Sequence, residues 1–445
     1  MRNDIFVFTG LPPFFCIFYE KILGGGKIFF VTCIGKYITK KILTTMKRLL
    51  LSLAMLGVAF SLSAQEKTDF GIYQYQDAKN PQMARHVKRQ DPMRQDIIIP
   101  QVNGYNVYKA DLHTHTIFSD ASVVPEYRIQ EAWYDGLDVI ACTEHIEYRR
   151  WESVMMQFLH GHLAPGAKAP EEIMQWKEIS DKVDFNLANR ISEREAKKYG
   201  ITLIPGAEIT RHSIKIGHYN ALFVKDVNTI WDIDAAQAIR NARKQGAVIM
   251  HNHPGWSRTT SEMTEFEKKV YAEKLIDGVE IMNGQEFYPN IVARASELGL
   301  FVSSNTDIHS TTALEYATHR QMRDMTFILA KDKSLASLKE AMLARRTLAF
   351  ACEQIAGEEQ LLKDFFIACV KFETISVDSK GKRTMIMSNV SSLPFYLQFG
   401  NSNPVELRAF TSRTVTTDAE GKLSFKVLNM WGPSEQQHPV LNLGF

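Results

Sequence analysis

The stretch DLHTHTIFSDAS, residues 111–122, decides how this chain of 445 residues is read. Its first two residues are the last two of a short apolar run, residues 107–112, which has the length and composition of a buried strand. Residues i and i+2 of an extended chain point to the same side, so His113 and His115 converge. Imidazoles are ligands that zinc, manganese and iron accept in proteins. The stretch therefore predicts metal ligands at the carboxyl end of a strand.

Four further clusters of the same kind follow along the chain, each at the carboxyl end of an apolar run. They are Thr143-Glu144-His145, then Pro205-Gly206-Ala207-Glu208 with His218 opening the next run, then His251-Asn252-His253-Pro254, and Asn305-Thr306-Asp307-Ile308-His309. Any single His near a strand end is more often structural than a ligand. Five clusters in this placement predict a shared site.

The apolar runs alternate with helical stretches, all but the last of which stop at glycine. The runs are residues 107–112, 137–142, 201–205, 219–224, 247–250, 278–282 and 300–304, and the helices are 125–136, 171–199, 234–245, 260–277, 286–298 and 335–345. This alternation predicts an α/β fold with parallel strands. Parallel barrels build their sites at the carboxyl ends of several strands, which would bring the five clusters together.

The combined motifs, from DLHTHTIFSDAS to the final Asp-Ile-His, resemble the PHP family (polymerase and histidinol phosphatase) over residues 105–350. The resemblance implies a distorted (β/α)7 barrel, two or three divalent metal ions (Zn, Mn or Fe) and hydrolysis of phosphate esters. It also implies the metal ligands. One ion would take His113, His115, Glu208 and Asp307, a second Glu208, His218 and His253, and a third Asp120, His145 and His309.

Two departures from the family pattern leave questions open. Its usual Thr-Asp-His is Thr-Glu-His here, so Glu144 has a longer arm for its expected contact behind the ligands. His251 is additional, and its spacing from His253 puts both on one side of a strand, so either could be the ligand.

Clustered divalent ions lower the pKa of bound water to near 7, which supplies hydroxide without a protein nucleophile. The catalytic group is thus expected to be this hydroxide, and Cys142 is expected to be a core residue. Three residues, Arg211, His251 and Arg258, are candidates for binding substrate, although an Arg in such a loop is as readily a solvated surface residue. The segment 148–170 is expected to form a loop over the site. The other histidines, at 86, 160, 162, 319 and 438, are expected to be structural or exposed.

Outside residues 105–350 the chain divides further. Residues 46–64 have the layout of a signal peptide, with Lys47 and Arg48 before a 12-residue apolar run and cleavage after Ser63 or Ala64. Residues 1–45 are expected to be an upstream extension outside the native protein, the alternative being a membrane anchor. Residues 65–104 form an extended lead-in, and the alternation of residues 365–445 predicts a small antiparallel β domain, β-sandwich-like.

The net charge of the protein limits the classes of substrate that we expect. The whole chain carries +2, but residues 65–445 hold 44 of the 52 Lys+Arg and 48 of the 50 Asp+Glu, a net −4. A mildly acidic mature protein argues against a long polyanion such as nucleic acid. Five cysteines without a C-x-x-C spacing exclude a disulfide scaffold and a zinc ribbon.

These observations predict an exported, periplasmic or secreted, metal-dependent phosphoesterase. It would act as a phosphodiesterase or phosphatase on small-molecule phosphate esters, with no membrane span in the mature protein. One alternative is a non-catalytic binding protein, in which structural metals support a β domain that binds a glycan or a partner. Another is a PHP-like hydrolase of a non-phosphate bond.

Overall fold

The computed structural model describes residues 14–23, 26–35, 75–77, 84–86, 93–149, 184–211, 213–316, 321–434 and 436–445. The chain divides into two compact units, Met1–Asp91 and Pro92–Phe445. In the first, β1 (Phe14–Leu23) pairs antiparallel with β2 (Gly26–Gly35), and β3 (Tyr75–Asp77) with β4 (Ala84–His86). The expected signal peptide and most of the 148–170 segment lie outside the described residues. No helix within the described residues is both long and apolar enough to cross a membrane.

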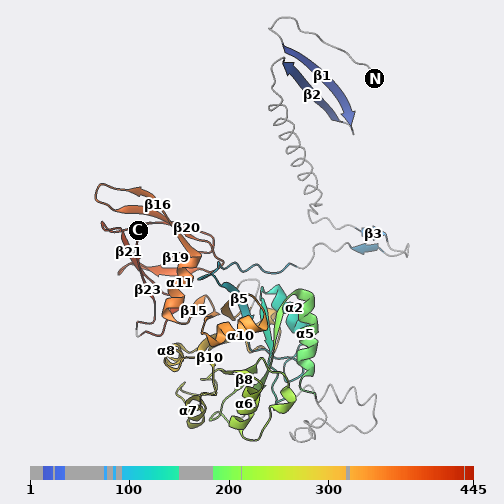
Figure 1. The fold of residues 1–445 in the computed structure, drawn as a ribbon, viewed down its shortest axis with the longest axis vertical. Helices are drawn as coiled ribbons and strands as arrows, with labels where there is room; N and C mark the ends of the chain where they lie inside the picture. The colour runs from blue at the N-terminus through green and yellow to red at the C-terminus, as the bar shows by residue number, and fades with distance from the viewer. Residues whose placement is uncertain are drawn as a thin grey trace. The chain divides into compact units, whose positions relative to one another are not determined.

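One curled sheet of twelve strands organises the second unit (Figure 1). Neighbouring strands run in the order β11 (Glu286–Phe287), β10 (Gly278–Asn283), β9 (Val248–His251), β8 (Tyr219–Leu222), β7 (Thr202–Ile209), β6 (Val139–Cys142), β5 (Asn106–Asp111), β13 (Met325–Ala330), β14 (Thr347–Ala351), β15 (Gln354–Ala356) and β22 (Met430–Trp431), while β12 (Phe301–Asn305) pairs with β10. The predicted α/β class is confirmed.

The expectation that all these strands are parallel is wrong. Strands β5, β6 and β7 are parallel, as are β9, β10 and β12. Strand β8 is antiparallel to β7 and β9, because the chain returns directly from Ile209 to Tyr219 without a crossover helix. Strand β13, which the apolar runs did not single out, is antiparallel to β5 and β14. The sheet is therefore mixed.

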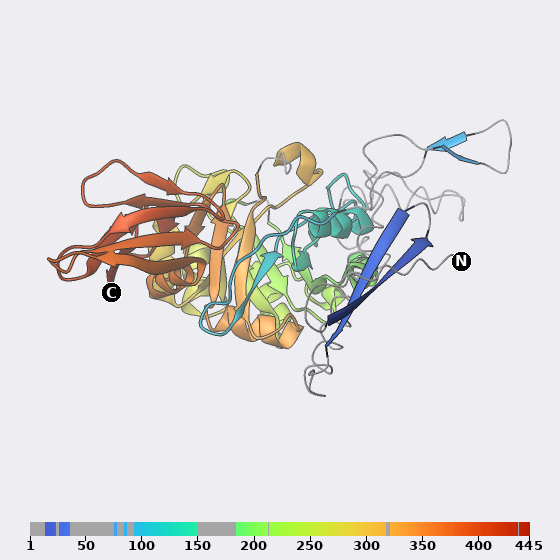
Figure 2. The ribbon, with the colours of Figure 1, turned by 90° about the horizontal axis from the view of Figure 1, so that it is seen from above.

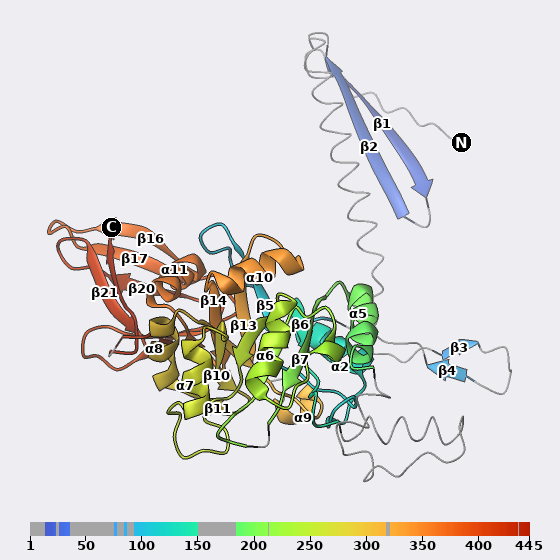
Figure 3. The ribbon, with the colours of Figure 1, turned by 60° about the horizontal axis from the view of Figure 1, so that its bottom comes forward.

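Most helices begin and end within about five residues of the predicted bounds. The predicted helix 171–199 is wrong in its extent, because residues 184–186 are not helical and the helix begins at Leu187, while residues 171–183 lie outside the described residues. The α-helices of the second unit within the described residues are α2 (Pro125–Tyr134), α5 (Leu187–Tyr199), α6 (Ala235–Lys244), α7 (Glu265–Ala272), α8 (Pro289–Leu298), α9 (Thr312–Glu315), α10 (Leu335–Leu343) and α11 (Glu359–Cys369), and η2 (Val227–Thr229) is a 3₁₀ turn. Proline occupies the first turn of α2 and of α8. Gly200 and Gly299 end α5 and α8 in the left-handed conformation, with φ of 65° and 70°. Figure 3 shows α5, α6 and α8 along the outer side of the sheet.

The C-terminal region forms two small antiparallel sheets, as predicted (Figure 2). One contains β16 (Val370–Val377), β17 (Arg383–Asn389) and β20 (Ser412–Thr416), and the other contains β18 (Phe395–Gln398), β19 (Val405–Leu407), β21 (Lys422–Val427) and β23 (Val440–Gly444). The predicted start at residue 365 falls inside α11, so the strands begin at Val370.

This β domain is not separated from the curled sheet. A single hydrophobic core contains Phe327 and Phe350 of the sheet together with Phe395 and Phe425 of the β domain. Strand β22 also pairs in parallel with β15. The two regions therefore share buried apolar surface.

Candidate metal centre

The predicted ligands stand at one edge of the sheet. His113 and His115 follow β5, His145 follows β6, and Asp307 and His309 follow β12. Because β8 is antiparallel, it begins at this edge, and His218 directly precedes it. The antiparallel direction of β8 is what places His218 beside the other ligands, since in an all-parallel sheet the start of this strand would lie at the opposite edge.

Six ligands, called here the inner donors, have donor atoms that lie close together: His113, His115, Glu208, His218, His253 and Asp307. Glu208 Oε2 is 3.5 Å from His113 Nε2 and 3.5 Å from His115 Nε2. Asp307 Oδ1 is 3.2 Å and 3.0 Å from the same two nitrogens. Glu208 Oε1 is 3.0 Å from His218 Nδ1, so this carboxylate faces both sides of the cluster. His113, His115 and Glu208 therefore form one metal-sized donor group, and Glu208, His218 and His253 form a second.

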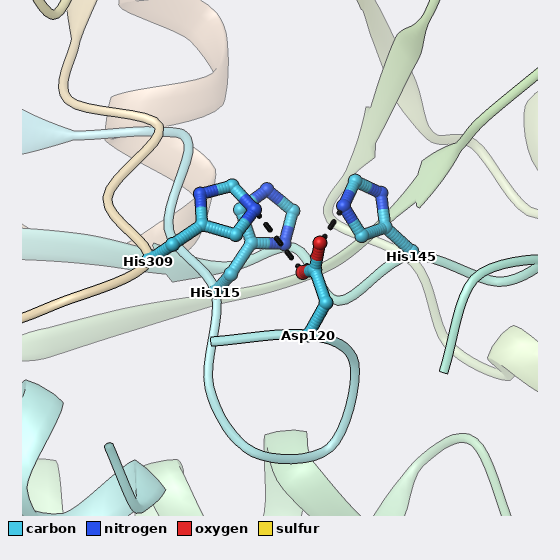
Figure 4. A group of neighbouring side chains, drawn as sticks. All are labelled: His115, Asp120, His145 and His309. Atoms are coloured by element: carbon cyan, nitrogen blue, oxygen red, sulfur yellow. Dashed lines mark ion pairs between the residues drawn. The ribbon is translucent and has the colours of Figure 1, made fainter. Parts of the chain in front are cut away.

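A further donor group, called here the outer set, consists of His115, Asp120, His145 and His309 (Figure 4). Asp120 Oδ1 is 3.1 Å from His309 Nε2 and 3.4 Å from His145 Nε2. The ring of His115 stacks on those of His145 and His309, with centroids 4.2 and 4.5 Å apart. His309 Nδ1 lies 2.7 Å from the Asp307 carbonyl, to which the ring donates, so Nε2 is the nitrogen that faces Asp120.

The donor set fits divalent metal ions. His113 Nε2, His115 Nε2, Glu208 Oε2 and Asp307 Oδ1 are buried and have no hydrogen-bond partner among the described residues. Buried polar atoms normally find a partner, and imidazole with carboxylate is the donor chemistry that zinc, manganese or iron accepts. All nine predicted ligands belong to the donor groups, which share members: His113, His115, Asp120, His145, Glu208, His218, His253, Asp307 and His309.

Electrostatics favour ligand-competent protonation states at most of these residues. Burial lowers the pKa of His115 and of His253 to about 3, so both rings are neutral at pH 7. At His145, Glu208 and Asp120 outweigh the effect of burial and raise the pKa to about 10. Burial raises the pKa of Glu208, but the neighbouring histidines outweigh it and hold that pKa well below its usual range. Neighbouring carboxylates likewise outweigh burial and raise the pKa of His113 and of His309, so these two rings and that of His145 must release a proton when cations bind.

Two ligands occupy strained backbone. His253 has a φ of 24° and Asp307 a φ of 52°, both in the left-handed region that residues other than glycine rarely adopt. Such strain costs on the order of 1–3 kcal/mol per residue and is typical of functional sites. At His253 it turns the chain directly after β9.

That turn decides between His251 and His253. His253 Nε2 lies 3.6 Å from Asp307 Oδ2, and its ring is 4.9 Å from that of His218. His251 instead directs Nδ1 to the Tyr271 hydroxyl at 2.8 Å, away from the donor groups. Alternation does not hold here because β9 ends at His251. His253 therefore belongs to the donor groups and His251 does not.

The two predicted substrate arginines are already engaged. Arg211 forms an ion pair with Glu147 and donates to the Asp232 carbonyl at 2.6 Å. Arg258 Nη2 pairs with Glu267 at 2.5 Å, and its side chain is 9% exposed. The geometry does not support substrate binding by either residue, since their charges stabilise loops behind the centre.

Sequence reasoning missed a buried carboxylate behind the ligands. Glu280 of β10 places Oε1 3.3 Å from His113 Nδ1, and its Oε2 accepts the backbone N–H of His253 at 2.8 Å. Asn305 Nδ2 donates to the same carboxylate at 2.8 Å. A carboxylate on the far nitrogen of a ligating imidazole orients the ring and increases its basicity. The available signal was a glutamate inside the otherwise apolar run 278–282.

Glu144 hydrogen-bonds the loop that carries the ligands and not the imidazole ring of a ligand. It accepts hydrogen bonds from the hydroxyls of Thr116 and Ser119, both at 2.6 Å. Ser119 Oγ in turn lies 3.4 Å from His115 Nδ1. The longer arm of Glu144 therefore fixes the turn between His115 and Asp120. Cys142 is buried in the core, as predicted, and burial raises the pKa of its thiol well above the usual range.

No family model matches the chain, and no curated protein matches it. Among solved structures, it is similar to a two-domain protein from Bacteroides vulgatus that contains a predicted PHP-like metal-dependent phosphoesterase. The two are 31% identical, and the match covers 80% of this chain and 100% of that one with a TM-score of 0.69. The chain belongs to the PHP family. The family predicted from the motifs is thereby confirmed.

Other solved structures match smaller parts of the chain at lower identity. One is a metal-dependent phosphoesterase described from Bifidobacterium adolescentis, 14% identical, covering 48% of this chain and 94% of that one, with a TM-score of 0.33. Another is a lesion-specific endonuclease from Pyrococcus furiosus, 16% identical, covering 57% and 59%, with a TM-score of 0.35. Neither likeness is strong enough to say more about this chain.

Proposed function

We propose that this PHP protein is an exported metal-dependent phosphoesterase that hydrolyses small organic phosphates. The observation that carries the proposal is the position of Glu208. Its two oxygens face His113 and His145 on one side and His218 on the other, at 2.7 to 3.5 Å. A carboxylate shared between donor groups is what a cluster of bridged cations needs.

Divalent ions held there would supply an activated water and neutralise charge on a phosphoryl group. The chain's own residues set the direction of approach. His113 and His115 are fully buried, whereas the side chains of Asp307 and His309 are 21% and 39% exposed. The open side of the centre is therefore the side on which Asp307 and His309 lie. Because Arg211 and Arg258 are engaged elsewhere, the charge of the phosphate falls to the cations.

The substrate size follows from charge. Residues 65–445 carry a net −4 and thus attract no long polyanion by electrostatics alone. Trp256, which is 48% exposed, lies 5.5 Å by ring centroid from both His218 and His253. An exposed aromatic ring beside the donor groups is suited to contact the organic part of a small ester.

The test is turnover of bis(p-nitrophenyl) phosphate and of p-nitrophenyl phosphate by protein loaded with Mn²⁺, Zn²⁺ or Fe²⁺. Hydrolysis of either by the loaded protein, lost after chelation, supports the proposal. A single-stranded oligonucleotide serves as the comparison substrate, and preferential cleavage of it would overturn the small-substrate part. Absence of turnover with every metal would overturn the proposal and leave the non-catalytic binding protein and the hydrolase of a non-phosphate bond.

Export is supported by the signal-like composition of residues 46–64. N-terminal sequencing of the protein from a periplasmic or secreted fraction should find a mature end at Ser63–Ala64 or at Ala64–Gln65. Full-length protein confined to the cytoplasm would contradict export without affecting the phosphoesterase proposal.

A further inference from the structure

Arg128 is a buried cation with an unusual set of acceptors. It lies in α2 and is 2% exposed. Its Nε donates to the His115 carbonyl at 3.0 Å, Nη1 to the Ser310 carbonyl at 2.9 Å, and Nη2 to the Ile308 carbonyl at 3.2 Å. One guanidinium therefore binds three main-chain oxygens directly.

These oxygens belong to the two loops that supply most of the outer set. The His115 carbonyl belongs to a ligand and precedes the turn to Asp120, while Ile308 and Ser310 flank the ligand His309 on both sides. The loops are about 190 residues apart in sequence, so they are held by contacts across space. Glu131, which pairs with Arg128, extends the connection because its Oε2 accepts the backbone N–H of Thr312 at 3.1 Å.

We propose that Arg128 is a positioning residue that holds the His115 and His309 loops in register and thereby forms the outer set as a separate cation site. Apart from His115, which belongs to both groups, the inner donors do not depend on it in the same way. Asp307 is held from the other side, where its N–H donates to the His113 carbonyl at 2.9 Å. Glu208 lies within strand β7. Loss of Arg128 therefore affects one cation more than the others.

Guanidinium geometry explains why arginine is needed. Its planar fork presents donors in fixed directions, so it can bind three carbonyls at once, whereas the ammonium of lysine is a single point of charge. Changing groups behind metal ligands typically lowers metal affinity by about 10–100-fold. We expect Arg128→Lys to weaken the outer-set cation by this factor.

The test measures Mn²⁺ binding rather than turnover, so its failure is distinguishable from failure of the proposed function. Wild type and Arg128→Lys are titrated with Mn²⁺ by calorimetry and analysed for bound metal after gel filtration. The matched control is Arg243→Lys. Arg243 lies in α6, donates to the Leu275 carbonyl at 3.0 Å and pairs with Asp277 at 2.6 Å, remote from every ligand.

The expected result is a loss of one Mn²⁺ equivalent from Arg128→Lys, regained at about 10–100-fold higher free Mn²⁺, with no loss from the control. Equal stoichiometry and affinity in all three proteins would overturn the proposal, and so would a wild type that never binds a cation at the outer set. Loss of all ions together would also overturn it.

A second variant addresses folding. Arg128→Ala leaves space for a free guanidinium ion, and millimolar guanidinium should restore the missing equivalent while methylammonium should not. Equal restoration by both cations would indicate a general charge effect and would contradict the positioning role. If Arg128→Lys does not fold, the rescue of Arg128→Ala by guanidinium tests the positioning role instead.

Discussion

Glu208 is the residue on which the metal centre depends most. Its carboxylate is completely buried and faces His113, His145 and His218. Glu208→Gln keeps the shape but removes the charge and one acceptor. We expect phosphodiester hydrolysis to fall below detection and the metal content to drop by at least one ion.

Elemental analysis and turnover of the loaded protein check this. The control is Glu267→Gln, a buried glutamate that pairs with His251 and Arg258 instead of with ligands and should keep its metal content. An active, fully loaded Glu208→Gln protein would refute the bridging role.

Asp324, which is not one of the metal ligands, gives the clearest prediction of how the free energy of unfolding depends on pH. It is completely buried, and neither carboxylate oxygen has a hydrogen-bond partner among the described residues. Burial, with some contribution from Asp111, raises its pKa well above the usual range. Above a pH of about 4 the unfolded carboxyl ionises while the folded one keeps its proton, so the free energy of unfolding falls as pH rises.

Asp324→Asn removes this penalty. It should raise the free energy of unfolding by about 1–3 kcal/mol at pH 8 and by less at pH 5, measured by urea unfolding at both values. Exposed Asp332→Asn should show no such gain. A gain of the same size at both pH values would show that the charge of Asp324 is not responsible.

How far single residues could be predicted depended on whether strand periodicity held. His113, His115 and His145 follow regular strands, and their convergence followed from spacing. His251 and His253 have the same spacing, but the left-handed φ of His253 turns the two rings apart. Only the backbone conformation reveals this. Glu280 could be suspected from its apolar surroundings, but its contact with His113 needs the three-dimensional structure.

At the scale of elements, α11 connects the curled sheet with the β domain. Phe365 stacks on Phe327 of β13 with centroids 5.7 Å apart, while Phe366 contacts Phe395 and Phe425 at 5.0 and 5.5 Å. Consecutive residues of one helix thus pack into different regions. The helix was not predicted because its apolar residues continue into β16 without a glycine or proline.

We expect Phe366→Ala to lower the free energy of unfolding by about 3–5 kcal/mol, since it removes a fully buried ring. The adjacent Ile367→Ala is the control, because Ile367 is 40% exposed and should cost much less. Chemical denaturation measures both. Similar losses from the two variants would mean that α11 does not connect the regions through Phe366.

Strand direction is the second element-scale feature that the sequence left open. The predicted runs 201–205 and 219–224 are separated by residues 206–218, which is enough chain for a short parallel crossover. Strand β7 extends to Ile209, however, so only residues 210–218 remain between β7 and β8, too few for such a crossover. Strand β13 follows a charged pair, Arg323 and Asp324, and a run of six apolar and threonine residues does not reveal its direction.

The molecule from Pro92 to Phe445 should behave as one cooperative unit. Its main hydrophobic core continues from the curled sheet through α11 into the β domain, and the nine ligands come from strands across that sheet. Without cations, the carboxylates of Glu208 and Glu280 remain buried near that of the half-buried Asp307, which destabilises the folded state.

Chelation should therefore lower the stability of both regions together. A cation present at 100 times its Kd contributes about 2.7 kcal/mol per site, which predicts a decrease of several degrees in Tm after treatment with EDTA. Calorimetry with and without Mn²⁺ measures the shift, and hydrogen exchange in β13 and β21 reports on the two regions separately. The same rise in exchange in both strands is expected, because they share one core. Loss of protection in β13 with β21 unchanged would mean that the β domain folds independently and that the shared core does not couple it to the metal centre.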